Sequence, residues 1–126
     1  MYEYKAKITA VIDGDTVDAM IDLGFDIWHK IRIRLFGLNC PESRTSNEIE
    51  KPYGLAAKQF TKDRIGGQEV RVEIHKQEKF GRYLAIIHYQ SNNTTINLNS
   101  ELIGTGHAKA YFGEKRGPFK EMDITK

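Results

Sequence analysis

The sequence begins with three segments in which hydrophobic and polar residues alternate. In residues 2–12 the even-numbered positions are Tyr, Ala or Ile, and most of the positions between them are charged or Thr. The alternation returns over residues 17–23 and 27–35, after the turn-forming segments 13–15 and 24–26. A period of two is typical of a strand with one buried face. Three such strands joined by short turns predict a meander.

The middle of the chain predicts two helices and two further strands. Residues 54–65 have helical spacing and are followed by two glycines, which signal the end of a helix. Residues 70–74 and 83–89 alternate as a fourth and a fifth strand. Residues 97–104 predict a short second helix. The charged stretch 43–51 is expected to be a mobile surface loop outside the core.

This order of elements predicts an α+β fold. Five strands, with one helix after the third and another after the fifth, favour a small five-stranded Greek-key β-barrel of the OB type with two or three flanking helices. Barrels of this type commonly bind nucleic acid on their outer face. The fold class alone therefore admits a nucleic-acid partner without specifying an activity.

The composition narrows the classes further. The chain has 126 residues, of which 40% are hydrophobic and 29% charged, so it fits one globular domain rather than a disordered or fibrous chain. The single cysteine, Cys40, excludes an internal disulfide framework and a zinc site made of cysteines. A net charge of +2 permits an anionic partner but does not require one.

Two segments beside predicted turns contain possible oxygen ligands, and the second of them also contains a guanidinium group. Asp13 and Asp15 flank a glycine and could offer carboxylate oxygens to a hard cation such as calcium, although Asp-Gly is also a common turn sequence. Arg34 ends a predicted strand and could bind a phosphate. Asn39 offers an amide oxygen, and Glu42 follows a proline that would hold a general base in place.

A third segment places Lys79 and Arg82 around a glycine turn before the fifth strand. For each of the three segments alone, a turn or strand end with solvated charges is the better explanation. Together they supply carboxylates, an amide oxygen and two arginines on one small barrel. That combination suits phosphodiester cleavage, in which a carboxylate activates water and cationic groups stabilise the developing negative charge.

In their order and spacing, these segments resemble the staphylococcal nuclease (thermonuclease) family. The matching pieces are VIDGDTV, RLFGLNCPE, a helix led by Tyr53-Gly54, EKFGR and GHAKAY, from about Tyr4 to Tyr111. The resemblance implies an OB-type barrel with calcium-dependent, sequence-nonspecific endonuclease activity on DNA and RNA. The products would carry 5′-hydroxyl and 3′-phosphate ends. It also implies a nuclease domain over residues 1–112 and a polar C-terminal tail over residues 113–126.

The resemblance assigns roles to individual residues. The implied calcium ligands are Asp15, Asn39 and the backbone carbonyl of Cys40; the implied catalytic residues are Arg34, Glu42 as general base and Arg82; and the implied substrate-binding residues are Lys79 and Tyr111. Asp13 resembles an acidic residue just outside the metal ligands.

The chain also departs from the family pattern. Asn39 stands where the family has a second aspartate ligand, and the lost negative charge is expected to weaken calcium binding. A second pocket tyrosine is absent from the neighbourhood of Phe112 and Gly113, and the family's third helix has no clear counterpart in residues 114–126. The alternative is a catalytically weak or inactive OB-fold module that binds nucleic acid. A protein-binding adaptor would leave the polar groups without a role.

The remaining features predict no second site. The longest apolar stretch, residues 83–87, is too short to span a membrane, and no signal-peptide pattern opens the chain. We expect a monomer, cytoplasmic as the chain stands and secreted only if a leader was removed. The four histidines (His29, His75, His88 and His107) have no mutual metal-ligand spacing and are expected to be surface or strand residues.

Overall fold

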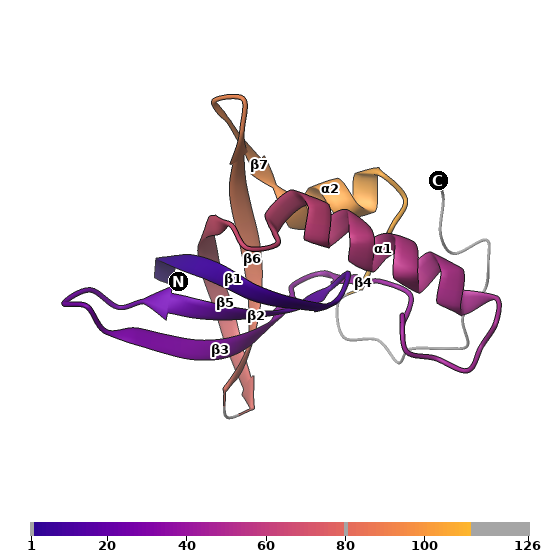
Figure 1. The fold of residues 1–126 in the computed structure, drawn as a ribbon, viewed down its shortest axis with the longest axis horizontal. Coiled ribbons are helices and arrows are strands. Elements are labelled where there is room, and N and C mark those ends of the chain that lie inside the picture. Colours follow the sequence, from indigo (N-terminus) through magenta and orange to yellow (C-terminus); the bar gives the residue numbers. More distant parts are fainter. Residues whose placement is uncertain (1, 80, 112–126) are drawn as a thin grey trace.

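The computed structural model describes residues 2–79 and 81–111 (Figure 1). Its elements are β1 (Tyr2–Asp13), β2 (Thr16–Asp22), β3 (Trp28–Leu35), β4 (Leu38–Asn39), α1 (Glu50–Ile65), β5 (Glu69–Lys79), β6 (Arg82–Ser91), β7 (Thr94–Asn97), α2 (Leu98–Gly104) and β8 (Lys109–Ala110). The predicted tail, residues 113–126, lies outside the described residues, as does Phe112. Neither helix in the described part is long and apolar enough to span a bilayer.

Five strands close into a barrel, which confirms the predicted fold class. Strands β3, β2, β1, β5 and β6 pair antiparallel in that order, and a parallel pairing between β3 and β6 joins the two ends. Beyond the barrel, β6 continues as a long hairpin with β7, and the two helices lie to one side of the strands (Figure 1). Closing the sheet removes the free strand edges that would otherwise remain exposed.

The barrel interior is filled by the alternating apolar residues of the strands. In β2, β3 and β6 the buried positions alternate as the sequence predicts. Strand β1 departs from the prediction after Ile8, because a register shift between Ile8 and Ala10 changes the face that points inward. Val11 rather than Ile12 therefore lies opposite Val17 and packs on the core. A β-bulge adds one residue to one strand, and the period of two cannot continue across it.

The first helix starts four residues earlier than predicted, at Glu50. Asn47 explains the early start, because its side-chain oxygen accepts hydrogen bonds from the backbone N–H groups of Ile49 and Glu50, at 2.9 and 3.1 Å. Pro52 then falls within the first turn, where a missing N–H group costs no helical hydrogen bond. The prediction that all of residues 43–51 form a surface loop is also wrong, since Ser43 and Glu50 are buried.

The sequence pattern predicts none of the three short strands β4, β7 and β8. The predicted break at residues 91–93 is a tight hairpin turn into β7, with positive φ at Asn92 and Asn93 (51° and 66°), as a type I′ turn requires. Strands β4 and β8 pair through only two residues each. A two-residue strand contains too few positions for an alternating pattern, so periodicity could not reveal it.

Helix α1 packs on the backbone of two loops that follow strands of the barrel. A Cβ atom added to Gly54 would lie 2.1 Å from the carbonyl oxygen of Glu42 and 2.6 Å from the amide nitrogen of Ser43. On the same helix, the buried hydroxyl of Thr61 donates a 2.7 Å hydrogen bond to the carbonyl oxygen of Gly14. The helix therefore sets the positions of the β1–β2 turn and of the segment after β4.

The close approach at Gly54 makes a prediction. The Gly54→Ala substitution should lower the free energy of unfolding by about 1–3 kcal/mol, the usual cost of overpacking, because the methyl group meets rigid backbone. It should also shift the backbone amide resonances of Glu42 and Ser43. Gly104 in α2 is the matched control, since no atom lies within 4 Å of the position that an added methyl group would take. Gly104→Ala should leave the free energy of unfolding unchanged or raise it slightly, because Gly104 is the last residue of α2, where helix propensity counts less than in the interior. Equal effects of the two substitutions in urea unfolding would contradict this account of α1 packing.

Candidate active site

A small cavity of about 160 Å³ opens where the β1–β2 turn, the end of β3 and the segment after β4 meet. Its lining residues are Asp13, Asp15, Thr16, Arg34, Cys40, Glu42 and Arg44. The cavity brings together several residues that the sequence singled out from separate segments. Arg44 also lines the cavity, but the sequence does not single it out, because it lies in the stretch 43–51 that is predicted to be a mobile surface loop.

Asp15 is the most buried acidic residue of this cavity, with only 7% of its surface exposed. One carboxylate oxygen accepts a hydrogen bond from the backbone N–H of Cys40 at 3.1 Å, and the other accepts one from the hydroxyl of Thr16 at 3.1 Å. The backbone carbonyl of Asp15 accepts a 2.8 Å bond from the N–H of Leu35. These bonds fix the carboxylate, and each of its oxygens keeps capacity for a further partner.

Burial raises the pKa of Asp15, because removal from water disfavours the charged form. The hydrogen bond from Cys40, the positive charge of Arg34 and the hydroxyl of Thr16 oppose this shift without cancelling it. A buried carboxylate with a raised pKa gains stability from a nearby cation. The electrostatics of Asp15 therefore fit a metal-ligand position.

Arg34 and Asn39 interact directly beside the cavity. A terminal nitrogen of the Arg34 guanidinium donates a hydrogen bond to the side-chain oxygen of Asn39, which is buried on β4. The amide nitrogen of Asn39 is buried and has no hydrogen-bond partner among the described residues. The oxygen is thus the part of this side chain that the site uses, as either a ligand or an anchor for Arg34.

The backbone around Glu42 is held from two sides. Its N–H donates to a carboxylate oxygen of Glu50 at 2.8 Å. The next residue, Ser43, donates from both its backbone N–H (3.2 Å) and its hydroxyl to one oxygen of Asp13. The side chain of Glu42 is exposed and lines the cavity. A solvent-accessible carboxylate on a fixed backbone can act as a general base toward water.

The donor set of the cavity suits a hard cation. Asp15 and Glu42 offer carboxylate oxygens, and Asn39 offers an amide oxygen nearby. The thiol of Cys40 faces the interior, where its sulfur would lie 2.9 Å from a Cβ atom at Gly14, so only its backbone is suited to serve the cavity. Oxygen ligands with a net negative charge are what calcium prefers, so the residues present fit the ion that the sequence suggested.

Arg82 lies outside the lining residues but on a neighbouring strand. The parallel pairing of β3 with β6 puts Arg82 opposite Arg32 and Leu84 opposite Arg34. Arg82 and Arg34 therefore project from the same outer face, two residues apart along the strands. This places both predicted arginines on one side of the barrel, although only Arg34 lines the cavity.

Tyr111, one of the two predicted substrate-binding residues, does not line the cavity. Tyr111 is half-buried, and its backbone N–H donates a 2.9 Å bond to the carbonyl of Gly37. Lys79 ends β5 and pairs in register with Arg82, but its side chain lies outside what the structure describes.

A wider hollow of about 670 Å³ lies near the end of α1, β6 and α2. It contains an ion pair between Arg64 and Glu101 (3.3 Å) and the hydroxyl of Tyr89, which donates to Glu101 at 2.6 Å. Burial and this acidic partner raise the pKa of Tyr89 to about 12. The Tyr89 phenol therefore stays protonated at neutral pH.

Comparison of the sequence with known proteins identifies its family. The family model described as "Staphylococcal nuclease homologue" matches residues 32–125. The thermonuclease of Staphylococcus intermedius is 37% identical over 106 residues, covering 82% of this chain and 59% of that protein. The thermonuclease of Staphylococcus hyicus is 33% identical, with 94% and 66% covered, and an uncharacterized protein of Methanocaldococcus jannaschii is 31% identical, with 86% and 59% covered. The chain spans about three-fifths of the length of these relatives.

The burial of Asp15 predicts an unusual pH dependence of stability. Its folded pKa lies above the unfolded value, so the folded state holds the proton more tightly, and stability falls as pH rises through this range. The cost therefore grows as pH rises above the unfolded pKa of Asp15. Asp15→Asn should therefore raise the free energy of urea unfolding at neutral pH in the presence of a chelator.

Asp18 is the matched control for that experiment. A hydrogen bond from Arg32 (2.8 Å) lowers the pKa of Asp18, so its charge stabilises the folded state above the unfolded pKa. Asp18→Asn should leave stability at neutral pH unchanged or reduce it. A loss of stability in Asp15→Asn would contradict the electrostatic picture of the cavity.

Proposed function

Because this chain belongs to the family of staphylococcal nuclease homologues, we propose that it is a nuclease that hydrolyses the phosphodiester bonds of nucleic acids. More specifically, we propose that it is a calcium-dependent, sequence-nonspecific endonuclease that acts on DNA and RNA. We further propose that it acts as a monomer and that residues 1–112 form the nuclease domain. The observation that carries the proposal is the convergence of Asp15, Arg34 and Glu42 on one small cavity.

Calcium is the cofactor that the proposal requires. The carboxylate of Asp15, the amide oxygen of Asn39 and the backbone carbonyl of Cys40 are the proposed ligands. When bound, calcium would supply positive charge for the phosphate oxygens. The Thr16 and Cys40 hydrogen bonds would hold Asp15 in place for this role, because they orient its carboxylate within the cavity.

Glu42 is the proposed general base. Its carboxylate would take a proton from the water that attacks phosphorus. The bonds from the Glu42 backbone to Glu50 and from Ser43 to Asp13 would keep this carboxylate in position. The bond from phosphorus to the 5′ oxygen then breaks, and that oxygen takes up a proton. The products carry a 5′-hydroxyl and a 3′-phosphate.

Arg34 and Arg82 are proposed to stabilise the negative charge that grows on the phosphoryl oxygens. Arg34 is half-buried beside the cavity, where a guanidinium is less screened by water than at the surface. Its bond to Asn39 orients the guanidinium before substrate arrives. Arg82 would reach the same phosphate from the adjacent strand β6, and Lys79 and Tyr111 would contact the neighbouring phosphate and nucleotide.

The size and chemistry of the cavity support the proposed lack of sequence specificity. A volume of about 160 Å³ suits a phosphate group rather than a nucleotide. Its charged groups are suited to contact phosphate, which is common to every sequence, and contacts of this kind carry no information about the base. The same argument permits both DNA and RNA as substrates.

Asn39 favours an alternative function, the binding of nucleic acid without efficient cleavage. The amide removes one negative charge from the proposed ligand set, and its oxygen already accepts a bond from Arg34. Both effects weaken the attraction for a dication. A domain that binds nucleic acid with little or no catalysis is therefore the second candidate function.

The decisive experiment is digestion of plasmid DNA and of RNA with calcium, with magnesium and with a chelator. We expect cleavage with calcium and none in excess chelator. Glu42→Gln should lower turnover by about 10²-fold or more, because it removes the general base. Glu48→Gln is the matched control, since Glu48 is exposed on the same segment but does not line the cavity. Full activity in chelator would refute the metal-dependent mechanism, and binding without cleavage would favour the alternative.

The two arginines should act on turnover more than on substrate affinity. Arg82→Lys keeps the charge but loses the forked donor geometry, so we expect turnover to fall by about 10²-fold with a smaller change in KM. Arg32→Lys is the matched control. Arg32 lies directly opposite Arg82 in the β3–β6 pair, but its guanidinium is held by Asp18 at 2.8 Å. Unchanged turnover in Arg82→Lys would show that Arg82 has no catalytic role.

A further inference from the structure

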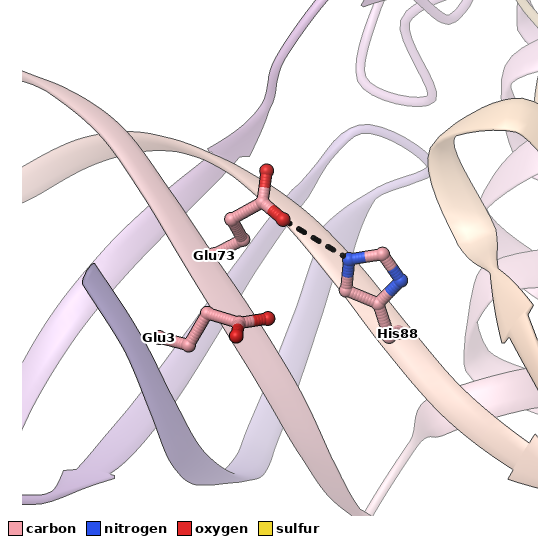
Figure 2. Close-up of side chains that lie close together, drawn as sticks. All are labelled: Glu3, Glu73 and His88. Atoms are coloured by element: carbon pink, nitrogen blue, oxygen red, sulfur yellow. Dashed lines mark ion pairs between the residues drawn. The ribbon is translucent and has the colours of Figure 1, made fainter. Parts of the chain in front are cut away.

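A second group of possible metal ligands lies on the outer face of the barrel, on strands β1, β5 and β6. Figure 2 shows the side chains of Glu3, Glu73 and His88 converging from these three strands. One ligand atom from each side chain lies within 4.8 Å of the others. None of the three residues lines the candidate active site.

The backbone register explains why these side chains meet. Glu3 on β1 lies directly opposite Glu73 on β5, and His88 on β6 lies opposite Arg71, two residues before Glu73. Residues two apart in a strand share a face, so His88 is the diagonal neighbour of Glu73. The site therefore stands on three paired strands rather than on loops.

Two carboxylates placed directly opposite each other repel, and such pairs destabilise a sheet. Arg71 offsets part of this repulsion, because its guanidinium lies 3.2 Å from a carboxylate oxygen of Glu3. Both side chains of that ion pair are about half exposed, so solvent screens the interaction strongly. A cation between Glu3 and Glu73 would remove the repulsion.

His88 contributes the observation that favours a metal over a simple ion pair. Its side chain is 16% exposed, and its Nε2 atom is buried without a hydrogen-bond partner among the described residues. The closest carboxylate oxygen, on Glu73, lies 3.6 Å away, beyond hydrogen-bond distance. Figure 2 draws this contact as an ion pair, but a buried polar atom without a hydrogen bond costs free energy, and a bound metal ion would satisfy this one.

Glu73 is already oriented for such a role. One of its carboxylate oxygens lies 2.9 Å from Nε2 of His75, which leaves the other oxygen on the side of His88. The ring of His75 stacks on Phe36 with centroids 4.5 Å apart, so the histidine is itself held in place. Ligating carboxylates in metalloproteins are commonly supported by such a hydrogen bond.

We propose that Glu3, Glu73 and His88 form a binding site for a divalent transition metal, with zinc as the ion that best fits the set. Imidazole nitrogen with carboxylate oxygens is a common zinc ligand combination, and water would complete the coordination. His75 is a positioning residue that orients Glu73. A bound ion would tie the first strand of the chain to β5 and β6. The site is independent of the proposed calcium site in both position and ligand chemistry.

The test uses the chain without an affinity tag, stripped of metal with a chelator and then dialysed. Isothermal titration with zinc chloride should show one zinc ion bound per chain, and Tm should rise with zinc concentration. His88→Gln, Glu73→Gln and Glu3→Gln should each weaken zinc affinity by more than about tenfold, the size of effect that even a supporting residue can cause. His29→Gln is the matched control, because His29 is exposed on β3, away from the cluster, and it should leave affinity unchanged.

Asp15→Asn separates this proposal from the nuclease proposal. Zinc affinity should be unchanged in this variant, whatever its effect on nucleic-acid cleavage. Loss of zinc binding in Asp15→Asn but not in His88→Gln would place the ion in the active site and overturn the proposal. Absence of zinc binding in the parent chain would also overturn it.

Two further measurements keep the test valid if substitution of the buried residue His88 prevents folding. Glu3 is half exposed, so Glu3→Gln should preserve the fold and still weaken zinc binding. In the parent chain, zinc should shift the imidazole NMR signals of His88 more than those of His29 and His107. Unperturbed His88 signals at saturating zinc would refute the assignment.

Discussion

Helix α1 packs directly on the backbone of two loops, and the geometry of the candidate active site depends on this contact. Gly54 leaves no room for a side chain against Glu42, and Thr61 holds the carbonyl of Gly14. One helix thus sets the distance between the turn that carries Asp15 and the segment that carries Glu42. A rigid element between two loops reduces their freedom before substrate arrives, which is a requirement for preorganised catalysis.

The two carboxylates of the cavity differ in their exposure to water, because Asp15 faces the protein interior and Glu42 faces solvent. Asp15 is buried, so its charge is costly and a cation relieves that cost. Glu42 is exposed, where a carboxylate can exchange protons with water. The barrel core therefore supplies the low-dielectric environment that would separate the proposed ligand role of Asp15 from the proposed base role of Glu42, although both residues are carboxylates.

On the outer face of the barrel, the fold also brings together carboxylates that a cation would stabilise, here with a histidine beside them. Glu3 and Glu73 meet because β1 and β5 pair in one particular register, and the neighbouring strand adds His88. Around the cavity the proposed ligands are all oxygens and come from a turn, a two-residue strand and a loop. On the strand face an imidazole nitrogen joins two carboxylates. The two sets suit different classes of cation, which allows two independent sites on one small domain.

The sequence by itself determined the strands of the barrel and singled out most of the residues that line the candidate active site, because the period of two in five segments and the short motifs around Asp15, Arg34 and Glu42 are local patterns. Only the tertiary structure decided the rest. The bulge that turns Val11 inward, the burial of Glu50 and the pairing of two-residue strands depend on neighbours that are distant in sequence. The cluster with His88 is the clearest case: its members are separated by 70 and 15 residues, and a register between strands, which no local spacing encodes, brings them together.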